Sequence, residues 1–306
     1  MSDGFRAASW LIGRHAQTIG GALVRTPWPT LVSEELELSD GDAVEWLRTG
    51  DPTGAPAVLL LPGLEGSIDS PYARQIVAAC AARGWCGAIL HHRGAARRPN
   101  RLARGCHSGD WSDAAAVCAR LTALGAARVS AVGVSLGGNV LLNWLGEAGA
   151  ACPLAAAVAV SVPYDLDACA RSLDRGFSRF YRDRLLRDMR DSALLKRHLN
   201  GFTPQWLATL DTFRRFDDAI TARQNGFAGV DDYYAKCSSG RRVGGIRVPA
   251  TLIHAADDPF VPLNSVPRDL PASVRMELSP HGGHVGFLTG AWPRPWLPQR
   301  VIAALE

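Results

Sequence analysis

The amino-acid sequence predicts an α/β fold with a mostly parallel, doubly wound sheet. The first observation is that apolar runs of strand length, such as AVLLL at 57–61, are continuous, as expected for strands buried on both faces. The second is that these runs alternate with helix-like segments of roughly 10 to 15 residues. The third is composition, since 306 residues with 47% hydrophobic and 20% charged side chains are typical of a globular chain. We expect one domain over residues 1–306.

The elements begin with a predicted hairpin. The first strand is predicted at 32–38, where VSEELEL alternates apolar and polar residues. The second strand is predicted at 43–48, and Ser-Asp-Gly-Asp at 39–42 forms the turn between them. The buried strand at 57–61 follows. A helix is predicted at 70–84, where serine is a suitable N-cap, proline occupies the first helical position and glycine ends the segment.

The same alternation continues through the first half of the chain. We predict strands at 86–92, 128–133 and 155–161, with helices near 109–124 and 138–148. Parallel strands joined by helices place their carboxyl ends along one edge of the sheet, where open α/β sheets bind ligands. Side chains just after these strands are therefore candidates for chemistry.

The alternation is interrupted at 165–240. This stretch contains amphipathic, arginine-rich segments and no convincing buried strand. We therefore expect a helical cap inserted over the sheet within the same domain. Strand patterns resume at 249–255 and 274–280, and the segment 296–306 predicts a closing helix.

Charge and cysteine usage argue against several classes of protein. The net charge of +4 is mild and lysine occurs only at positions 196 and 236, so nucleic-acid binding has no support. Seven scattered cysteines without a Cys-x-x-Cys pair predict reduced packing residues of a cytoplasmic protein rather than a disulfide frame or a zinc site. Because no signal-peptide core and no apolar stretch of about 18 residues occurs, no membrane span is expected. Nothing in the sequence indicates an oligomeric state.

The segment VSAVGVSLGGNV carries the most specific chemical signal. Its apolar start suits the predicted strand, and the residues after Ser135 suit a helix. Glycines at 133 and 137 allow a tight turn that side chains would obstruct. This pattern is typical of a nucleophile elbow, in which Ser135 is exposed at the carboxyl edge of the sheet.

A serine nucleophile needs a base and an acid. Its hydroxyl is weakly nucleophilic unless a histidine takes the proton, and in this kind of fold the chain order is serine, acid, histidine. Two acid candidates lie in ADDPFVP, just after the strand at 249–255. Asp258 is favoured over Asp257 because acids of this type commonly precede a proline turn. Asp165, after the preceding strand, is a weaker alternative.

The histidine candidates lie in SPHGGHVGF, just past the strand at 274–280. His284 is favoured because the paired glycines before it let the backbone bring its side chain to the sheet edge. His281 is the alternative and is more simply explained as a loop residue. Each signal alone also fits an ordinary turn. Their occurrence after three predicted strands, in the required order, favours a triad of Ser135, Asp258 and His284.

An ester carbonyl attacked by serine develops negative charge, which needs preorganised N–H donors. The backbone N–H of Leu136, directly after the nucleophile, is one expected donor. The second is expected from LPGLEGS, the loop after the strand at 57–61, and Leu64 is the candidate. The alternative is that PGLEG is only a turn.

Longer motifs extend from about residue 12 to residue 290. They are RHAQTI, LPGLEGSIDSPYARQI, HHRGAARRPNRLARGCHSGD, GVSLGGNVLLNWLGE, SVPYDL, FDDAITARQNGFAGVDDYY, ADDPF and HGGHVGF. In these segments the chain resembles the YheT family of α/β hydrolases, whose eukaryotic branch comprises the abhydrolase-domain proteins of the ABHD1, ABHD2 and ABHD3 type.

The resemblance implies an α/β-hydrolase fold and places its triad at Ser135, Asp258 and His284. The family pattern has Asp or Asn followed by Asp in the acid motif, which supports the second acid of the pair. Members are described as carboxylesterases, lipases, phospholipases or alcohol acyltransferases. This chain departs from the family where HHRG stands in place of Asn-x-Arg-Gly and AARRPNR replaces a Cys-Ser-Gly-Glu type stretch. These departures leave the choice of substrate open.

Two segments bear on the substrate. The loop at 93–104 carries five arginines, which either clamp a lipid phosphate or pair structurally with acids such as Asp110 and Asp113; the structural interpretation is favoured. The insertion carries aromatic residues at roughly helical spacing, most of which are expected to pack and a few to line an acyl pocket. They are Phe177, Phe180, Tyr181, Trp206, Phe213 and Phe216.

Together these features predict a serine hydrolase that cleaves carboxylic esters of short to medium acyl chains through an acyl-Ser135 intermediate. The expected partner is a small-molecule or lipid ester, and no metal or organic cofactor is required. Acyl transfer to an alcohol and phospholipase activity are alternatives that use the same triad. A non-enzymatic binding protein with a hydrolase fold is a further alternative, which the intact serine, acid and histidine disfavour.

Overall fold

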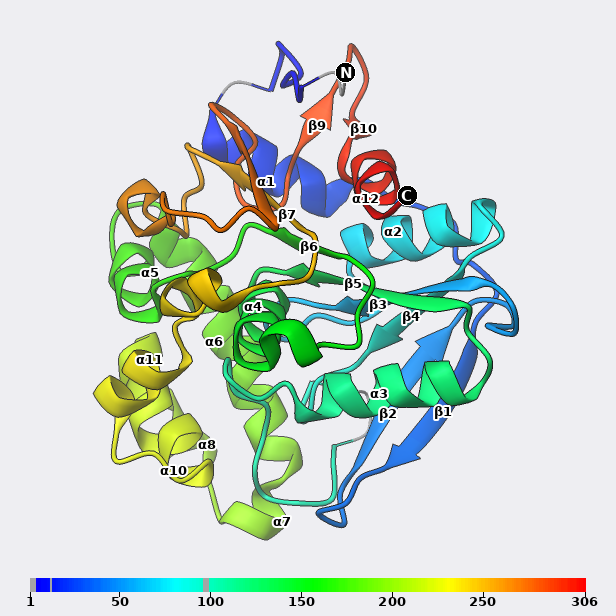
Figure 1. The fold of residues 1–306 in the computed structure, drawn as a ribbon. Coiled ribbons are helices and arrows are strands. Elements are labelled where there is room, and N and C mark those ends of the chain that lie inside the picture. The colour runs from blue at the N-terminus through cyan, green and yellow to red at the C-terminus, as the bar shows by residue number, and fades with distance from the viewer. Residues whose placement is uncertain (1–3, 12, 96–98) are drawn as a thin grey trace.

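The computed structural model describes residues 4–11, 13–95 and 99–306. Within these residues, eight strands form one sheet in the order β1-β2-β4-β3-β5-β6-β7-β8 (Figure 1). The pairs β1–β2 and β2–β4 are antiparallel and the other neighbours are parallel. The strands are β1 (Val32–Glu37), β2 (Ala43–Arg48), β3 (Pro56–Leu61), β4 (Cys86–Leu90), β5 (Arg128–Val134), β6 (Ala157–Val160), β7 (Ala250–Ala255) and β8 (Val274–Ser279).

Helices cover both faces of the sheet (Figure 1), with α2 (Pro71–Ala82) and α12 (Leu297–Leu305) on one face and α3 (Ser112–Ala123) and α4 (Leu136–Ala148) on the other. Alternate residues of β3 pack into the hydrophobic cores on the two faces of the sheet. Leu59 and Leu61 lie in the core under α3 and α4, whereas Val58 and Leu60 lie in the core under α2 and α12. Burial of each such side chain contributes about 1.5–3 kcal/mol. This two-sided burial is the physical reason for the continuous apolar run.

The strand register brings the loops after several strands to one edge. β3 and β5 pair Leu61 with Gly133, so the loop after β3 lies next to the turn after β5. β7 and β8 pair Ala255 with Ser279, so the loops after these two strands are also neighbours. The residues that follow β5, β7 and β8 are thereby gathered at the carboxyl edge of the sheet.

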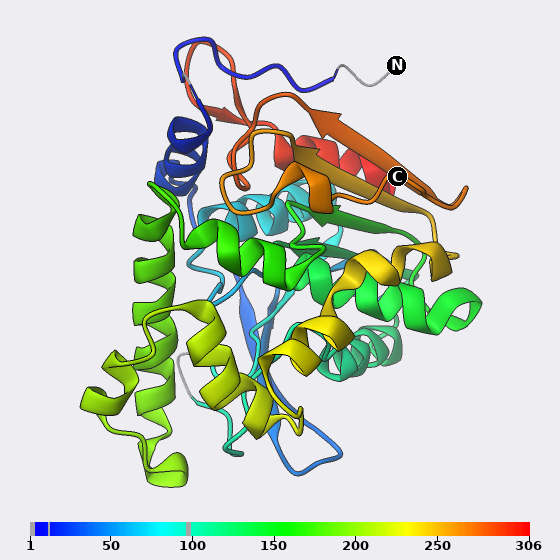
Figure 2. The same ribbon diagram turned by 90° about the vertical axis from the view of Figure 1, so that its left-hand side faces the viewer.

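Between β6 and β7 the chain leaves the sheet for a series of helices, which Figure 2 shows in green to yellow at one side of the molecule. Their apolar faces form a core cluster of their own, which includes Leu186, Phe213 and Tyr234. The helices are α5 (Leu166–Leu173), α6 (Ser178–Leu195), α7 (Arg197–Asn200), α8 (Pro204–Ala208), α9 (Phe213–Phe216), α10 (Ala222–Gln224) and α11 (Val230–Cys237).

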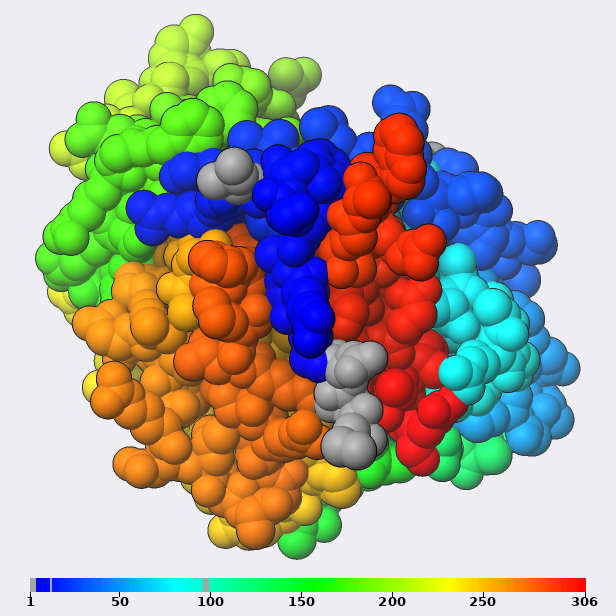
Figure 3. Space-filling view, turned by 90° about the horizontal axis from the view of Figure 1, so that it is seen from above, coloured from blue at the N-terminus to red at the C-terminus, as the bar shows by residue number. Residues whose placement is uncertain are grey.

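Two elements near the carboxyl edge are missing from the sequence-based prediction. One is α1 (Arg14–Leu23), and the other is a short antiparallel pair, β9 (Leu288–Thr289) with β10 (Arg294–Pro295). α1 lacks a buried apolar row, because its one buried residue is Gln17. In Figure 3 the N-terminal segment, in blue, lies beside the orange-to-red C-terminal segment.

The other predicted elements occur in the structure, with ends that shift by up to three residues. The helix expected at 138–148 begins earlier, at Leu136, and the strand expected at 86–92 ends at Leu90. No helix among the described residues combines the length and the apolar character needed to cross a membrane.

Candidate active site

Ser135 lies in a strained turn between β5 and α4. Its backbone has φ 53° and ψ −119°, a region that residues other than glycine rarely adopt. A Cβ at Gly133 would lie 2.5 Å from the Gly137 carbonyl oxygen, and one at Gly137 would lie 2.1 Å from the Leu61 carbonyl oxygen. The two glycines therefore allow the turn to close against β3 and hold the serine hydroxyl at the sheet edge.

The structure brings the three favoured side chains into one hydrogen-bonded row. His284 Nε2 lies 3.0 Å from Ser135 Oγ, and His284 Nδ1 lies 2.8 Å from Asp258 Oδ2. The other carboxylate oxygen of Asp258 accepts the Phe260 N–H at 2.8 Å and the Val261 N–H at 3.2 Å. Because the Asp258 side chain is fully buried, these bonds fix its direction. Such a row can take a proton from the hydroxyl and stabilise the resulting imidazolium.

The alternative acids and histidine have other partners. Asp257 accepts a backbone N–H of the glycine pair at 2.9 Å and faces His281, whose Nδ1 is 3.4 Å from Asp257 Oδ2. The side chain of His281 is 67% exposed. Asp165 caps α5 by accepting a backbone N–H at 3.0 Å. Among the hydrogen bonds of the described residues, none joins these three side chains to Ser135 or to the His284 ring.

An aromatic stack fixes the plane of the imidazole. The ring of Phe260 lies parallel to that of His284, with centroids 4.0 Å apart and an interplanar angle of 8°. Tyr181 of α6 packs against Phe260 in turn, at 4.9 Å between centroids. Sequence reasoning missed Phe260, although it is the last letter of ADDPF. The helical insertion thus contributes to the orientation of the histidine.

The two expected oxyanion donors line the same cavity as Ser135. Leu136 is the first residue of α4, so its N–H has no partner within the helix. In the loop after β3, the Gly63 N–H is occupied by Tyr72 Oη at 2.8 Å, and Glu65 turns the chain with φ 54°. Leu64 stands between these two residues. Its backbone amide and that of Leu136 are the two candidate oxyanion donors.

A carboxyl group that sequence reasoning missed lies beside the loop after β3. Glu65 Oε2 accepts the hydroxyl of Ser192, on α6, at 2.6 Å. Burial raises the pKa of Glu65 to about 7, because desolvation disfavours the carboxylate. The only signal in the sequence was GLEG, where the flanking glycines point to a turn and say nothing of a buried acid.

A cavity of about 770 Å³ lies between the serine and the helical insertion. Of the aromatic residues expected there, Phe180, Tyr181 and Phe213 line it. Phe177 and Trp206 are not among its lining residues, and their exposed fractions are 53% and 39%. A volume of this size is in the range of sites for small organic ligands.

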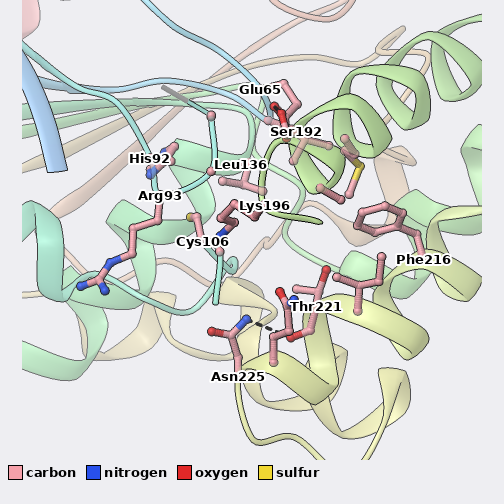
Figure 4. A pocket seen from close by; sticks show the side chains of 18 residues that line it. Glu65, His92, Arg93, Cys106, Leu136, Ser192, Lys196, Phe216, Thr221 and Asn225 are labelled. Atoms are coloured by element: carbon pink, nitrogen blue, oxygen red, sulfur yellow. Dashed lines mark hydrogen bonds between the residues drawn. The ribbon is translucent and has the colours of Figure 1, made fainter. Parts of the chain in front are cut away.

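A smaller cavity of about 90 Å³ adjoins the first and is shown in Figure 4. Phe216, Leu136, Glu65 and Lys196 are among its lining residues. The Lys196 ammonium donates to Asn100 Oδ1 at 3.0 Å and to three backbone carbonyl oxygens at 2.9–3.2 Å. Burial lowers the pKa of Lys196 to about 8. These bonds tie the end of α6 to the loop that follows β4.

Comparison with known proteins shows which family this chain belongs to. A family model for the alpha/beta hydrolase fold matches residues 56–291. The chain belongs to the α/β-hydrolase family. It is 42% identical over 280 residues to YheT of Escherichia coli (strain K12), named as a candidate esterase, with 88% of this chain and 82% of the relative covered. It is 30% identical to the phospholipase ABHD3 of Mus musculus, with 93% and 73% covered. This hydrolase is therefore a YheT-type member.

Solved structures share the fold. The esterase Pf2001 of Pyrococcus furiosus superposes with a TM-score of 0.60 at 15% identity, over 92% of this chain and 97% of that one. A 2,6-dihydroxy-pseudo-oxynicotine hydrolase gives 0.57 at 20% identity, over 90% and 68%. The α/β-hydrolase fold and the family resemblance predicted from the sequence are confirmed.

The arginine-rich loop of this hydrolase is tied to the body of the protein. Arg93 forms a two-pronged pair with Asp113, at 2.8 Å from Nε and 2.7 Å from Nη2. Arg104 pairs with Asp110 at 3.3 Å. Residues 96–98, which include two of the five arginines, lie outside the described residues. For the described arginines the geometry favours the structural interpretation over a phosphate clamp.

Within the described residues, no group of three or more His, Cys, Asp or Glu side chains could hold a metal ion. The seven cysteines are free. Burial raises the pKa of Cys80 to about 12, so this thiol stays protonated at neutral pH and is not a nucleophile.

Proposed function

We propose that this hydrolase cleaves carboxylic esters of short to medium acyl chains through an acyl-Ser135 intermediate. One observation carries the proposal: Ser135 Oγ is 3.0 Å from His284 Nε2, while the other ring nitrogen is 2.8 Å from the buried carboxylate of Asp258. A hydroxyl, an imidazole and a carboxylate in this order are the parts of a serine nucleophile with its base and orienting acid.

In the first half-reaction, Ser135 Oγ attacks the ester carbonyl carbon while His284 Nε2 takes the hydroxyl proton. The backbone N–H groups of Leu64 and Leu136 stabilise the oxyanion of the tetrahedral intermediate. Asp258 holds the other ring proton on Nδ1 and stabilises the imidazolium. His284 then gives its Nε2 proton to the leaving alcohol, the carbon–oxygen bond breaks, and the acyl group stays on the serine.

In the second half-reaction, a water molecule replaces the alcohol. His284 takes a proton from the water as its oxygen attacks the acyl carbon, and returns that proton to Ser135 Oγ as the ester bond to the enzyme breaks. The products are a carboxylic acid and the original hydroxyl.

The larger cavity supports an acyl-binding role for the insertion. Its volume of about 770 Å³ borders Ser135, and apolar side chains from α5 and α6 such as Leu173, Leu185 and Met189 form part of its wall. Apolar walls favour a hydrocarbon chain because its transfer from water contributes about 0.8 kcal/mol per buried CH₂. Substrates with longer acyl chains should therefore show lower KM until the cavity is filled.

The test is turnover of a nitrophenyl ester by the Ser135→Ala variant. We expect the burst of nitrophenol and steady turnover to fall by more than about 1,000-fold, because the nucleophile is removed. Ser265→Ala, a serine in a loop after β7, is the control and should behave as wild type. Turnover by Ser135→Ala equal to that of wild type would reject the mechanism.

Phospholipase activity is the second candidate for the same site. It is favoured by the activity in the name of the ABHD3 relative and by the size of the cavity. An ester panel that varies acyl length and includes a phosphatidylcholine separates the two. Product analysis with ethanol present measures acyl transfer to an alcohol, and labelling by a fluorophosphonate tests the non-enzymatic alternative.

The proposed partner is a small-molecule or lipid ester. A cytoplasmic location is part of the proposal, supported by seven cysteines that are free and scattered.

A further inference from the structure

The N-terminal helix α1 lies against the loop that carries His284. This helix is outside the matched hydrolase region, which begins at residue 56. In Figure 3 its segment, in blue, runs between the green helices of the insertion and the orange-to-red loop and strands after β8. The motif RHAQTI, which begins this helix, has no part in the mechanism given above.

Thr18 connects α1 to the backbone of the histidine. Its Oγ1 accepts the His284 N–H at 2.9 Å and donates its own proton to the Arg14 carbonyl oxygen at 2.8 Å. The hydroxyl is thus fixed by its helix and serves the loop as an acceptor. His284 is consequently held at three points, the Thr18 hydroxyl on its backbone and two side chains on its ring.

Gln17 adds a second connection, four residues further along the loop. Its Nε2 donates to the Leu288 carbonyl oxygen at 3.1 Å, and its Oε1 accepts the Leu288 N–H at 2.8 Å. The side chain is only 1% exposed. A buried amide that lost these partners would pay a desolvation cost, so the pairing specifies how α1 docks.

Glycines allow the backbones of α1 and the loop to touch. A Cβ at Gly21 would lie 2.8 Å from the Gly286 Cα, and one at Gly286 would lie 2.3 Å from the Gln17 carbonyl oxygen. A Cβ at Gly283, next to His284, would lie 2.5 Å from the Arg14 carbonyl oxygen. Side chains at these positions would push the helix away from the histidine.

The loop held by α1 is conformationally strained. Val285 has φ 60° and Phe287 has φ 42°, both in the region that favours glycine. Such residues persist only where the surroundings over-determine them, at a cost of about 1–3 kcal/mol each. On the other side of the loop, Ser161 Oγ accepts the Val285 N–H at 3.1 Å. α1 and the loop after β6 therefore hold the strained segment between them.

We propose that Thr18 is a positioning residue for His284, so that α1 belongs to the catalytic apparatus of this hydrolase although it lies outside the matched region. The inference rests on the proposed function. Thr18 acts through the backbone of His284. Without the Thr18 hydroxyl, the imidazole is no longer held at the distance from which it can take the serine proton.

The test compares Thr18→Val with Thr18→Ser on a nitrophenyl ester. Valine keeps the shape of the side chain and removes the acceptor, so kcat should fall by about 10- to 100-fold with little change in KM. Serine keeps the hydroxyl and should restore most of kcat. The control is Thr122→Val on α3, because Thr122 Oγ1 also donates to the carbonyl oxygen four residues earlier, at 3.1 Å, far from the site.

Thermal unfolding and the low-field proton resonance of the His284–Asp258 hydrogen bond are measured on each variant. A folded Thr18→Val protein with a shifted or broadened resonance and low kcat supports the inference. A kcat equal to that of Thr122→Val, or a serine variant as slow as the valine variant, overturns it. If Thr18→Val does not fold, the Thr18→Ser and Thr18→Ala pair decides in the same way. An inactive wild type would instead refute the proposed function.

Discussion

The adjacent acids Asp257 and Asp258 provide a matched pair for testing the role of the carboxylate. We predict that Asp258→Asn lowers kcat by about four orders of magnitude, whereas Asp257→Asn changes it by less than about threefold. The two substitutions are chemically identical and one residue apart. Of the two acids, Asp258 is the one that contacts the His284 imidazole, at 2.8 Å from Nδ1 to Oδ2.

The size of the effect follows from the hydrogen bonds of the buried carboxylate. An asparagine can still accept the Phe260 and Val261 N–H groups through its oxygen, because those donors lie on the Oδ1 side. Its NH₂ group then faces His284 Nδ1, which must become an acceptor, and the ring proton moves to Nε2. In that tautomer Nε2 cannot take the proton of Ser135. A loss of about 10⁴ in kcat equals about 5.4 kcal/mol of activation free energy at 1.36 kcal/mol per tenfold.

The assay is steady-state turnover of a nitrophenyl ester at neutral pH, with thermal unfolding of each variant to show that it is folded. Loss of activity in Asp257→Asn with near-normal activity in Asp258→Asn would refute the assignment of the acid. Activity of Asp258→Asn within about tenfold of wild type would refute the tautomer argument itself.

Three further predictions concern stability. Burial raises the pKa of Glu65 from 4.5 to about 7, so the folded protein binds more protons than the unfolded chain in that window and loses stability as pH rises through it. From pH 4.5 to pH values above 7, the free energy of unfolding of Glu65→Gln, measured with urea, should therefore rise by about 3 kcal/mol relative to that of wild type. A difference between the two proteins that does not change with pH would contradict this. Gly137→Ala, which puts a methyl group 2.1 Å from the Leu61 carbonyl oxygen, should lower the free energy of unfolding by more than about 3 kcal/mol. Gly244→Ala, with no atom within 4 Å of its Cβ, should change it by less than about 0.5 kcal/mol. Arg93→Met should lower the free energy of unfolding by about 3–5 kcal/mol, because it removes the positive charge that pairs with the buried carboxylates of Asp42 and Asp113. KM for esters should stay unchanged, and a raised KM for phospholipids alone would support the phosphate clamp instead.

Much of the fold could be predicted because the signals are local. The run at 57–61 is continuous because each face of β3 meets a different helical layer, and that requirement is written directly in the residue pattern. The elbow is equally local, since Gly133 and Gly137 are needed for contacts within one strand–turn–helix unit and with the neighbouring strand. The site candidates followed from the order of residues after the strands.

Other features depend on contacts between distant segments. Whether Asp257 or Asp258 faces His284 depends on how the loop after β7 turns. That turn is fixed by the backbone N–H groups of Phe260 and Val261, which donate to Asp258. Glu65 becomes a buried acid only because α6, more than 120 residues away in the chain, places Ser192 over it. No pattern in the local sequence contains that information.

α1 shows the same limit for an entire element. Its inner face carries Gln17 and glycines rather than an apolar row, because it docks by hydrogen bonds and close backbone contact. Hydrophobic periodicity, the main sequence signal for helices, is therefore weak there. The motif RHAQTI was visible in the sequence, but its partner loop lies some 270 residues later.

The proposed function requires that the hydroxyl of Ser135 becomes acylated during turnover. The most direct measurement is mass spectrometry of enzyme quenched in acid within the first turnover of a nitrophenyl ester, followed by peptide mapping. We predict one added acyl group, on the peptide that contains Ser135, and no adduct in Ser135→Ala. An acyl group on any other residue, or steady hydrolysis with no adduct on rapid quenching under burst conditions, would contradict it.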